Sequence, residues 1–192
     1  METLTEFGDS SPPRHHATWL PRISTILERA DGMDVHWVVV SKQVEQATTV
    51  VERGQTFHIL PRKSLAWSIV TGFWSDRRRM AALLDDLNPD LVHCWGTEDC
   101  YGYVAVDWRG ESILSMQGLL QVYCQACPQP FLLRLQAWHE SKVLPKVHRL
   151  TVESPWGREH LGRLAPQAEV SLLEYGADQA CFEATWNPAE ER

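Results

Sequence analysis

Six short apolar runs alternate with longer stretches of helical periodicity, and this alternation limits the folds open to the chain more than any other feature. The runs cover residues 35–40, 57–60, 91–94, 112–116, 149–152 and 170–173. Several are almost continuously apolar, which is typical of strands covered on both faces in a parallel sheet. The pattern predicts an α/β fold: a Rossmann-like, doubly wound parallel sheet with helices on both faces.

Apolar residues recur at helical spacing between these runs. They predict helices within residues 19–30, 69–87 and 131–142. A further helix is expected to begin at Ser154-Pro155, because a capping serine followed by proline is a typical helix start. Residues 1–7 are short and polar for a first strand, so either the opening strand is poor or the chain has lost its natural beginning.

Charge and hydropathy exclude some classes of protein. A net charge of −7 argues against general nucleic-acid binding, which needs a basic footprint, although Arg77–Arg79 is a candidate basic patch. No run approaches the roughly 20 apolar residues of a membrane-spanning helix. Residues 1–16 lack the basic-then-apolar pattern of a signal peptide, so a cytoplasmic location is expected.

The cysteines and the familiar cofactor motifs give little sign of metal or nucleotide chemistry. Five cysteines, an odd number, make a disulfide framework unexpected. Cys124 and Cys127 have the spacing of a zinc or redox pair, but a second such pair is missing, and a proline-rich loop is predicted there. The glycine-rich dinucleotide fingerprint, the P-loop and the serine-hydrolase elbow are all absent. No metal site is therefore expected.

Polar chemistry collects where the predicted strands end. In open α/β sheets, ligands bind beyond the carboxyl ends of the strands. Four polar, glycine-containing segments fall there, at residues 8–16, 93–98, 115–118 and 153–157. Together they predict a cleft. Single residues also have structural explanations: a histidine at a strand end is often hydrogen-bonded in the core, and an acidic residue is favoured at a helix N-terminus without any ligand.

Several motifs follow one another in a definite order. Asn88-Pro-Asp-Leu-Val-His93 leads into Trp95-Gly-Thr-Glu98, and Leu114-Ser-Met-Gln-Gly118 comes next. The later motifs are Trp138-His-Glu140, Leu150-Thr-Val-Glu-Ser154 and Glu174-Tyr-Gly-Ala-Asp178 with Phe182. This order resembles the N-terminal domain of GT-B glycosyltransferases of the family 4 type, and the resemblance covers roughly residues 15–192.

The resemblance implies a retaining, two-domain glycosyltransferase. Its N-terminal domain would bind the acceptor, and its C-terminal domain would bind the nucleotide-sugar donor. Residues 1–185 would then be the Rossmann-like acceptor domain, and residues 186–192 would begin the linker to a donor domain that this chain lacks. The chain alone is expected to be inactive and to hold no cofactor, since the nucleotide-sugar belongs to the full-length enzyme.

The resemblance also assigns candidate site residues. The acceptor side of the cleft would be formed by His93, Trp95, Gly96, Thr97 and Glu98, with Gln117 and Gly118 as its floor. Further cleft candidates are His15, His16, Glu140, Glu153 and Ser154. Two features depart from the family: the loop at residues 8–13 has a single glycine, and Gln117 stands where many relatives carry histidine. Glutamine cannot act as a base, so its role would be hydrogen bonding to a hydroxyl.

The acceptor would be a sugar, a glycan or a glycolipid, and no nucleic-acid partner is expected. Relatives of this type often work at the inner membrane surface. The corresponding patch here would be Trp67, Phe73, Trp74 and Arg77–Arg79, although the aromatic residues are rather expected to pack against the sheet. Two alternatives stay open: a stand-alone, non-catalytic α/β module that binds a ligand or partner, and a cysteine-based metal or redox domain.

Overall fold

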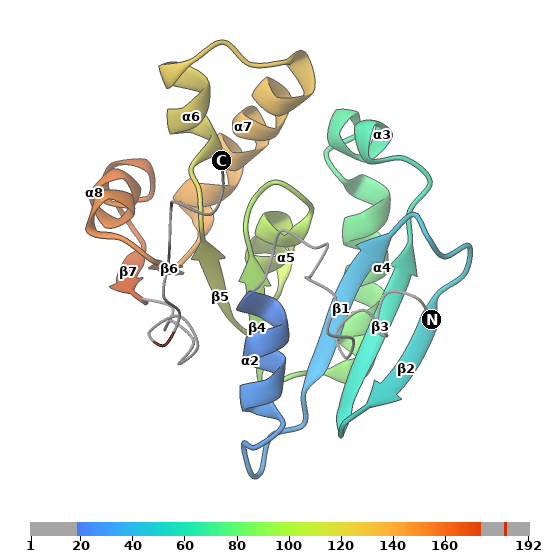
Figure 1. The fold of residues 1–192 in the computed structure, drawn as a ribbon. Coiled ribbons are helices and arrows are strands. Elements are labelled where there is room, and N and C mark those ends of the chain that lie inside the picture. The colour runs from blue at the N-terminus through green and yellow to red at the C-terminus, as the bar shows by residue number, and fades with distance from the viewer. Residues whose placement is uncertain (1–18, 174–182, 184–192) are drawn as a thin grey trace, which may run out of the picture.

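The computed structural model describes residues 19–173 and residue 183 and has the expected α/β architecture (Figure 1). Four parallel strands form one sheet in the order β4-β5-β6-β7. These strands are Leu91–Trp95, Glu111–Met116, Arg149–Val152 and Glu169–Leu172. Each follows a helix, so this half of the chain is built from the helical crossovers that parallel strands need.

A second sheet contains three strands in the order β1-β3-β2. β1 (His36–Ser41) runs parallel to β3 (Gln55–Pro61), as expected. The interval between them holds no helix, however, and instead forms β2 (Thr48–Glu52), which is antiparallel to β3. Its β-branched residues favour a strand. Arg53 and Gly54, with φ angles of 50° and 74°, make the tight two-residue turn of a hairpin.

The helices include all the predicted ones, with one main correction, and two more at residues 101–107 and 120–126 lie outside the predicted positions. The helices are α2 (Trp19–Leu27), α3 (Leu65–Val70), α4 (Trp74–Leu87), α5 (Tyr101–Asp107), α6 (Leu120–Ala126), α7 (Phe131–Val143), the short 3-10 turn η1 (Leu144–Lys146) and α8 (Pro155–Leu164). The single helix predicted within residues 69–87 is in fact α3 and α4. Gly72 and Phe73 separate them, because both have positive φ angles that no α-helix accommodates.

Aromatic packing near this break is only partly as predicted. Phe73 is fully buried and belongs to the core, as expected. Trp67 and Trp74 were expected to pack against the sheet as well, but both indoles are exposed. The reason is their position: Trp67 lies on the outer side of α3, and Trp74 starts α4 directly after the left-handed residue Phe73.

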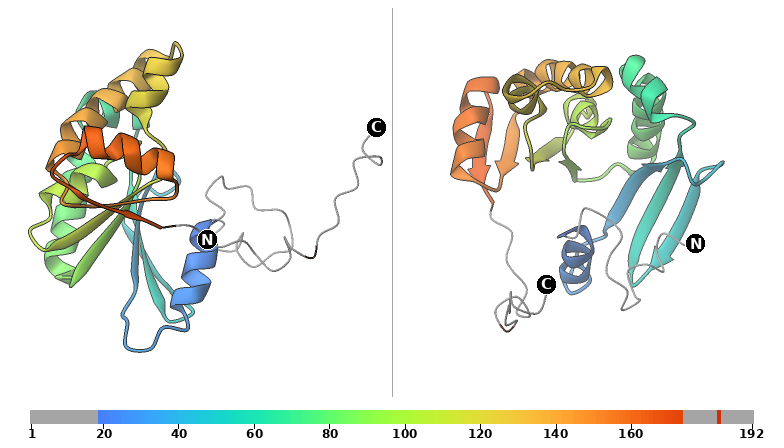
Figure 2. Two further views of the ribbon diagram at one scale, coloured as in Figure 1. Left: turned by 90° about the vertical axis from the view of Figure 1, so that its left-hand side faces the viewer. Right: turned by 45° about the horizontal axis from the view of Figure 1, so that its top comes forward.

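The core lies between the four-stranded sheet and the helices on one of its sides. Leu114 and Leu150 of the strands, Met80 of α4 and Leu161 of α8 are all almost completely buried there. α2 lies on the other side of the molecule (Figure 2). Along β4, Val92 and Cys94 face the core, so His93 and Trp95 point to the opposite face of the sheet.

Some predictions fall on residues outside the described part of the chain. They concern the opening strand at residues 1–7, His15 and His16, the motif at residues 174–178 with Phe182, and the domain boundary after residue 185. Within the described residues, the helices are all too short or too polar to cross a lipid bilayer.

Candidate functional site

Two loops begin side by side at the carboxyl ends of β4 and β5. The backbone N–H of Gly96 donates to the carbonyl of Ser115 at 2.9 Å, which extends the pairing of the two strands by one residue. Beyond this bond the residues Glu98, Gln117 and Gly118 are exposed. The structure therefore brings the two principal predicted segments to one edge of the sheet.

Gly96 gives the first loop its shape. Its φ angle of +72° lies in the left-handed region, and a Cβ atom at this position would collide with the carboxyl group of Glu98. Glu98 thus folds its carboxyl over the backbone of Gly96. This loss of solvent, followed by the negative charge of Glu140, raises the pKa of Glu98 above its ordinary value.

We expect Gly96→Ala to lower the free energy of unfolding by about 1–3 kcal/mol. The left-handed conformation is sterically unfavourable for alanine, and the added Cβ atom would also displace the carboxyl of Glu98. Urea-induced unfolding followed by circular dichroism measures this loss. Gly162→Ala is the matched control: Gly162 lies in α8 with open space around it, and alanine there should stabilise the protein by about 0.5–1 kcal/mol. Equal effects of the two changes would contradict the account of Gly96.

Side chains of α7 form hydrogen bonds with the loop after β4. Thr97 is buried, and its hydroxyl donates to the Glu140 carboxylate at 2.6 Å. The same carboxylate accepts the backbone N–H groups of Leu120 and Gln121, at 3.2 and 2.9 Å, at the start of α6. One turn earlier on α7, Gln136 donates to the backbone carbonyl of Glu98. Glu140 therefore joins the two loops from inside, and the Thr97 hydroxyl is engaged within the domain.

His93 and Trp95 occupy the open face of β4. Their rings stack with centroids 4.4 Å apart. The Nε2 atom of His93 lies 2.6 Å from Ser115 Oγ, which in turn lies 2.5 Å from Thr151 Oγ1. His93 is exposed as a residue, but the stacked indole partly desolvates its imidazole, and this desolvation lowers the pKa of His93.

The row from His93 through Ser115 to Thr151 crosses three neighbouring strands. Ser115 lies in the predicted cleft segment 115–118 and Thr151 in the motif at residues 150–154, but neither was assigned a site role. Ser115 lies between Leu114 and Met116, and Thr151 lies between Leu150 and Val152. A polar residue flanked by buried ones is the alternation of a strand with one polar face. That pattern was the available signal.

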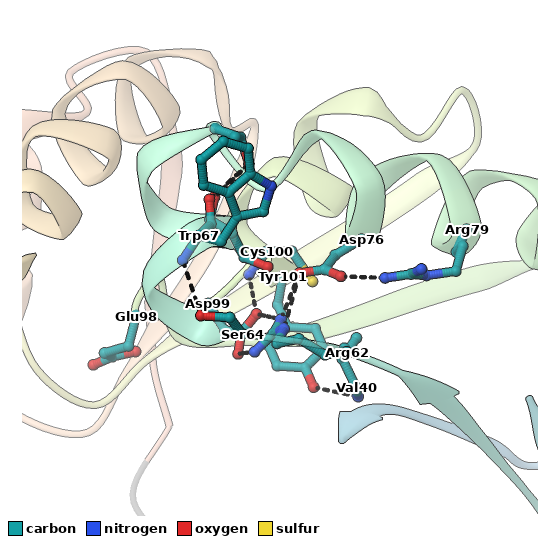
Figure 3. Close-up of polar contacts among 12 residues, drawn as sticks. Val40, Arg62, Ser64, Trp67, Asp76, Arg79, Glu98, Asp99, Cys100 and Tyr101 are labelled. Carbon is teal, nitrogen blue, oxygen red and sulfur yellow. Dashed lines mark hydrogen bonds and ion pairs between the residues drawn. The ribbon is translucent and has the colours of Figure 1, made fainter. Parts of the chain in front are cut away.

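A second polar cluster, built around Arg62, was not predicted (Figure 3). Arg62 follows β3 and is buried; its Nε atom donates to Asp76 Oδ2 at 2.9 Å. Its terminal nitrogens bind both oxygens of Asp99, one of them at 2.6 Å, and Arg79 also binds Asp76 at 2.7 Å. In Figure 3, Glu98 points away from this cluster. No local sequence pattern reveals the cluster, because Arg62 is separated from Asp76 by 14 residues and from Asp99 by 37.

The remaining candidates lie on the side of β6. Ser154 caps α8 by accepting the N–H of Gly157 at 3.1 Å, as its sequence context predicted. Glu153 precedes it, half-buried, and burial raises the pKa of its carboxyl. Next to Gly118, an open apolar groove runs between α6 and α8, lined by residues that include Leu119, Val122, Tyr123 and Trp156.

The cysteine pair lies in a different setting from the predicted proline-rich loop. Cys124 is part of α6, and Cys127 is the residue that ends this helix. The two are not joined by a disulfide, and Gln129 Nε2 donates to Cys127 Sγ at 2.9 Å. Among residues 19–173, no group of three or more metal-ligating side chains converges.

The sequence was also compared with known proteins. No protein-family model matches this chain, and no curated protein matches it either.

Proposed function

We propose that this domain binds the sugar-containing acceptor of a retaining glycosyltransferase whose nucleotide-sugar donor is held by another domain. One observation carries the proposal: an exposed glutamate, an exposed glutamine and a glycine stand at the ends of two adjacent parallel strands, beside an apolar groove. Carboxylate and amide groups match the hydroxyls of a sugar, and the groove next to Gly118 suits an apolar portion of the acceptor.

Each residue has a defined part in this proposal. Glu98 accepts hydrogen bonds from acceptor hydroxyls, and Gln117 donates or accepts one. Gly118 leaves room for the ligand, because a Cβ atom there would meet nothing within 4 Å. The stacked rings of His93 and Trp95 form an aromatic surface on the face of β4 that points away from the core. Gln117 cannot remove a proton, so the chain would orient the attacking hydroxyl and leave proton transfer to the departing phosphate.

The two loops fit an acceptor better than a nucleotide-sugar. A diphosphate is usually bound by cationic side chains or by the free N–H groups of a helix N-terminus. Residues 96–100 and 117–119 contain no lysine or arginine. The nearby Arg62 is already bound to Asp76 and Asp99, and Glu140 occupies the first N–H groups of α6. The donor would therefore be bound by residues of a second domain. The expected compartment is the cytoplasm, where nucleotide-sugars are made.

Saccharide binding to the chain tests this proposal. We expect NMR titration with a panel of mono- and disaccharides to shift the amide signals of residues 96–98 and 117–118. Glu98→Gln and Gln117→Ala should each weaken binding about tenfold, the loss of roughly one hydrogen bond to a ligand. Matched controls are Glu169→Gln and Gln167→Ala, exposed residues at the opposite edge of the sheet, which should leave binding unchanged.

Two outcomes would contradict the proposal. The first is saccharide binding that the Glu98 and Gln117 variants leave unchanged, because the ligand would then lie elsewhere. The second is tight binding of a nucleotide-sugar by this chain alone, because the donor site would then be on this domain. Specific binding of a non-carbohydrate ligand at residues 96–98, without any saccharide binding, would favour the non-catalytic binding module.

A further inference from the structure

Cys124 and Cys127 lie one helical turn apart at the end of α6, and neither has a part in the proposed sugar site. The backbone N–H of Cys127 donates to the carbonyl of Tyr123 at 3.2 Å, so the last turn of the helix is intact up to this residue. Residues three apart in an α-helix have Cα atoms about 5 Å apart. Disulfides join cysteines whose Cα atoms are roughly 4.4–6.8 Å apart, so the backbone spacing of this pair suits a disulfide.

The two sulfur atoms are reduced and contact different carbonyl groups. Cys127 Sγ lies 3.6 Å from the carbonyl oxygen of Tyr123, the residue before Cys124, and is thus turned back along the helix toward its neighbour. Cys124 Sγ lies 3.9 Å from the carbonyl oxygen of Leu133 in α7. A disulfide would therefore exchange two weak sulfur–carbonyl contacts for one covalent bond.

The chain around Cys127 can accommodate this change. Cys127 has extended backbone angles, φ −151° and ψ 150°, and Pro128 follows it. Proline has no N–H group, so the helical hydrogen bonds of α6 end at Cys127. A small movement of Cys127 would therefore disturb at most the one bond from its N–H group to Tyr123.

The other two cysteines among the described residues are unsuited to such chemistry. Cys94 and Cys100 are 4% and 0% exposed, whereas Cys124 and Cys127 are half-buried. Burial raises the pKa of the Cys94 and Cys100 thiols, and a thiol attacks a disulfide only when it is ionised. The hydrogen bond from Gln129 Nε2 to Cys127 Sγ, at 2.9 Å, stabilises negative charge on that sulfur during an attack. Cys127 is therefore the expected attacking residue.

The cysteine pair also borders the apolar groove between α6 and α8. Tyr123 and Ala126, each next to one of the two cysteines in the sequence, line this groove together with Trp156. The contact of Cys124 with Leu133 connects α6 to α7. A disulfide would remove this contact and fix the last turn of α6, so the α6 side of the groove would change shape.

We propose that Cys124 and Cys127 form a reversible dithiol–disulfide site, which is oxidised by exchange with a low-molecular-weight disulfide such as glutathione disulfide. The Cys127 thiolate attacks one sulfur of glutathione disulfide, forms a mixed disulfide and releases one glutathione thiolate. The Cys124 thiolate then attacks the Cys127 sulfur, closes the intramolecular bond and releases the second glutathione thiolate. Two protein thiols are oxidised, one disulfide is reduced, and the two thiol protons pass to the two glutathione molecules. The site does not depend on sugar binding at the strand ends.

Incubation of the 192-residue chain with glutathione disulfide, followed by alkylation of free thiols, tryptic digestion and mass spectrometry, tests the proposal. Residues 110–134 form one tryptic peptide, in which Cys124 and Cys127 are the only cysteines. We expect this peptide to lose two hydrogen atoms and to regain both thiols with dithiothreitol. Cys124→Ser should retain one glutathione on Cys127, because no second thiol displaces it.

Two glutamine variants test the local chemistry. Gln129→Ala should slow the exchange about fivefold, which corresponds to the loss of one hydrogen bond. Gln125→Ala, which changes an exposed glutamine of α6, is the matched control and should leave the rate unchanged. Oxidation should also shift the NMR amide signals of residues 122–127 and 133 and leave those of β2 in place. Unaltered far-ultraviolet circular dichroism would show that every variant is folded.

Several outcomes would overturn the proposal. Recovery of both thiols unmodified from the folded chain would show that the pair is not a site of exchange. A glutathione adduct that persists on Cys127 in the unaltered chain would show that Cys124 does not reach it. A disulfide from either residue to another cysteine would contradict the assigned pairing. Identical amide signals of Tyr123 and Ala126 in the reduced and oxidised chain would contradict the effect on the groove.

Discussion

Replacing Arg62 with alanine should lower the free energy of unfolding by about 3–5 kcal/mol. The guanidinium is buried and neutralises two carboxylates, Asp76 and Asp99, of which Asp76 is 1% exposed. Burial alone would lower the pKa of Arg62, but the hydrogen bonds and charges of Asp99 and Asp76 outweigh it and raise the pKa. Without Arg62, Asp76 stays buried, and among the described residues Arg79 remains as its ion-pair partner.

Urea-induced unfolding measures this effect, with two variants as references. Arg62→Lys keeps the charge but loses the paired hydrogen bonds to Asp99, so we expect an intermediate loss. Arg79→Ala removes the half-buried second partner of Asp76 and should cost about 1 kcal/mol or less. If Arg62→Ala cost no more than Arg79→Ala, water would be replacing the guanidinium, and the cluster would not stabilise the fold as described.

Glu140→Ala is the second change with a large expected effect, a loss of about 3–5 kcal/mol in the free energy of unfolding. The carboxylate is fully buried and accepts hydrogen bonds from Thr97 and from the N–H groups of Leu120 and Gln121. Alanine leaves all three donors buried without their acceptor. It also removes a negative charge from the N-terminus of α6, where the helix dipole favours one.

The expected loss has a local signature as well as a global one. Amide hydrogen exchange of Leu120 and Gln121 should speed up in Glu140→Ala more than exchange in α8 does, because the acceptor of these two N–H groups is gone. Glu140→Gln retains one acceptor oxygen and should lose about 1–2 kcal/mol. Glu159→Ala, which removes an exposed carboxylate on α8, is the surface control. Unchanged exchange at residues 120 and 121 would contradict the capping role.

The strands were the most predictable part of this fold. All six predicted apolar runs are strands, because a buried parallel strand leaves little room for polar residues. β2 was missed because an expectation of strand–helix alternation obscured its β-branched residues and the Arg53-Gly54 turn. The break at Gly72 and Phe73 was missed for another reason: the apolar period continues across it, and only the backbone angles reveal it.

The candidate site was predictable where it depends on position along a strand. The loops after β4 and β5 lie side by side because the carboxyl ends of parallel strands meet at the same edge of a sheet. This places Gly96 and Glu98 beside Gln117 and Gly118. The inward role of Thr97 was not predictable, since its partner Glu140 lies 43 residues away. Arg62 and Asp99 are separated by 37 residues, and their pairing likewise arises only from the tertiary fold.

The two sides of α7 have a mechanical consequence. The inner side of α7 carries Gln136 and Glu140, one turn apart, which form hydrogen bonds with the loop after β4. The outer side carries Trp138 and Lys142, also one turn apart. The helix is thus a rigid spacer only one helix diameter thick, about 10 Å, between the loop after β4 and any partner on its outer side. Contact on the outer side would therefore fix both the distance and the tilt of this loop relative to the partner surface.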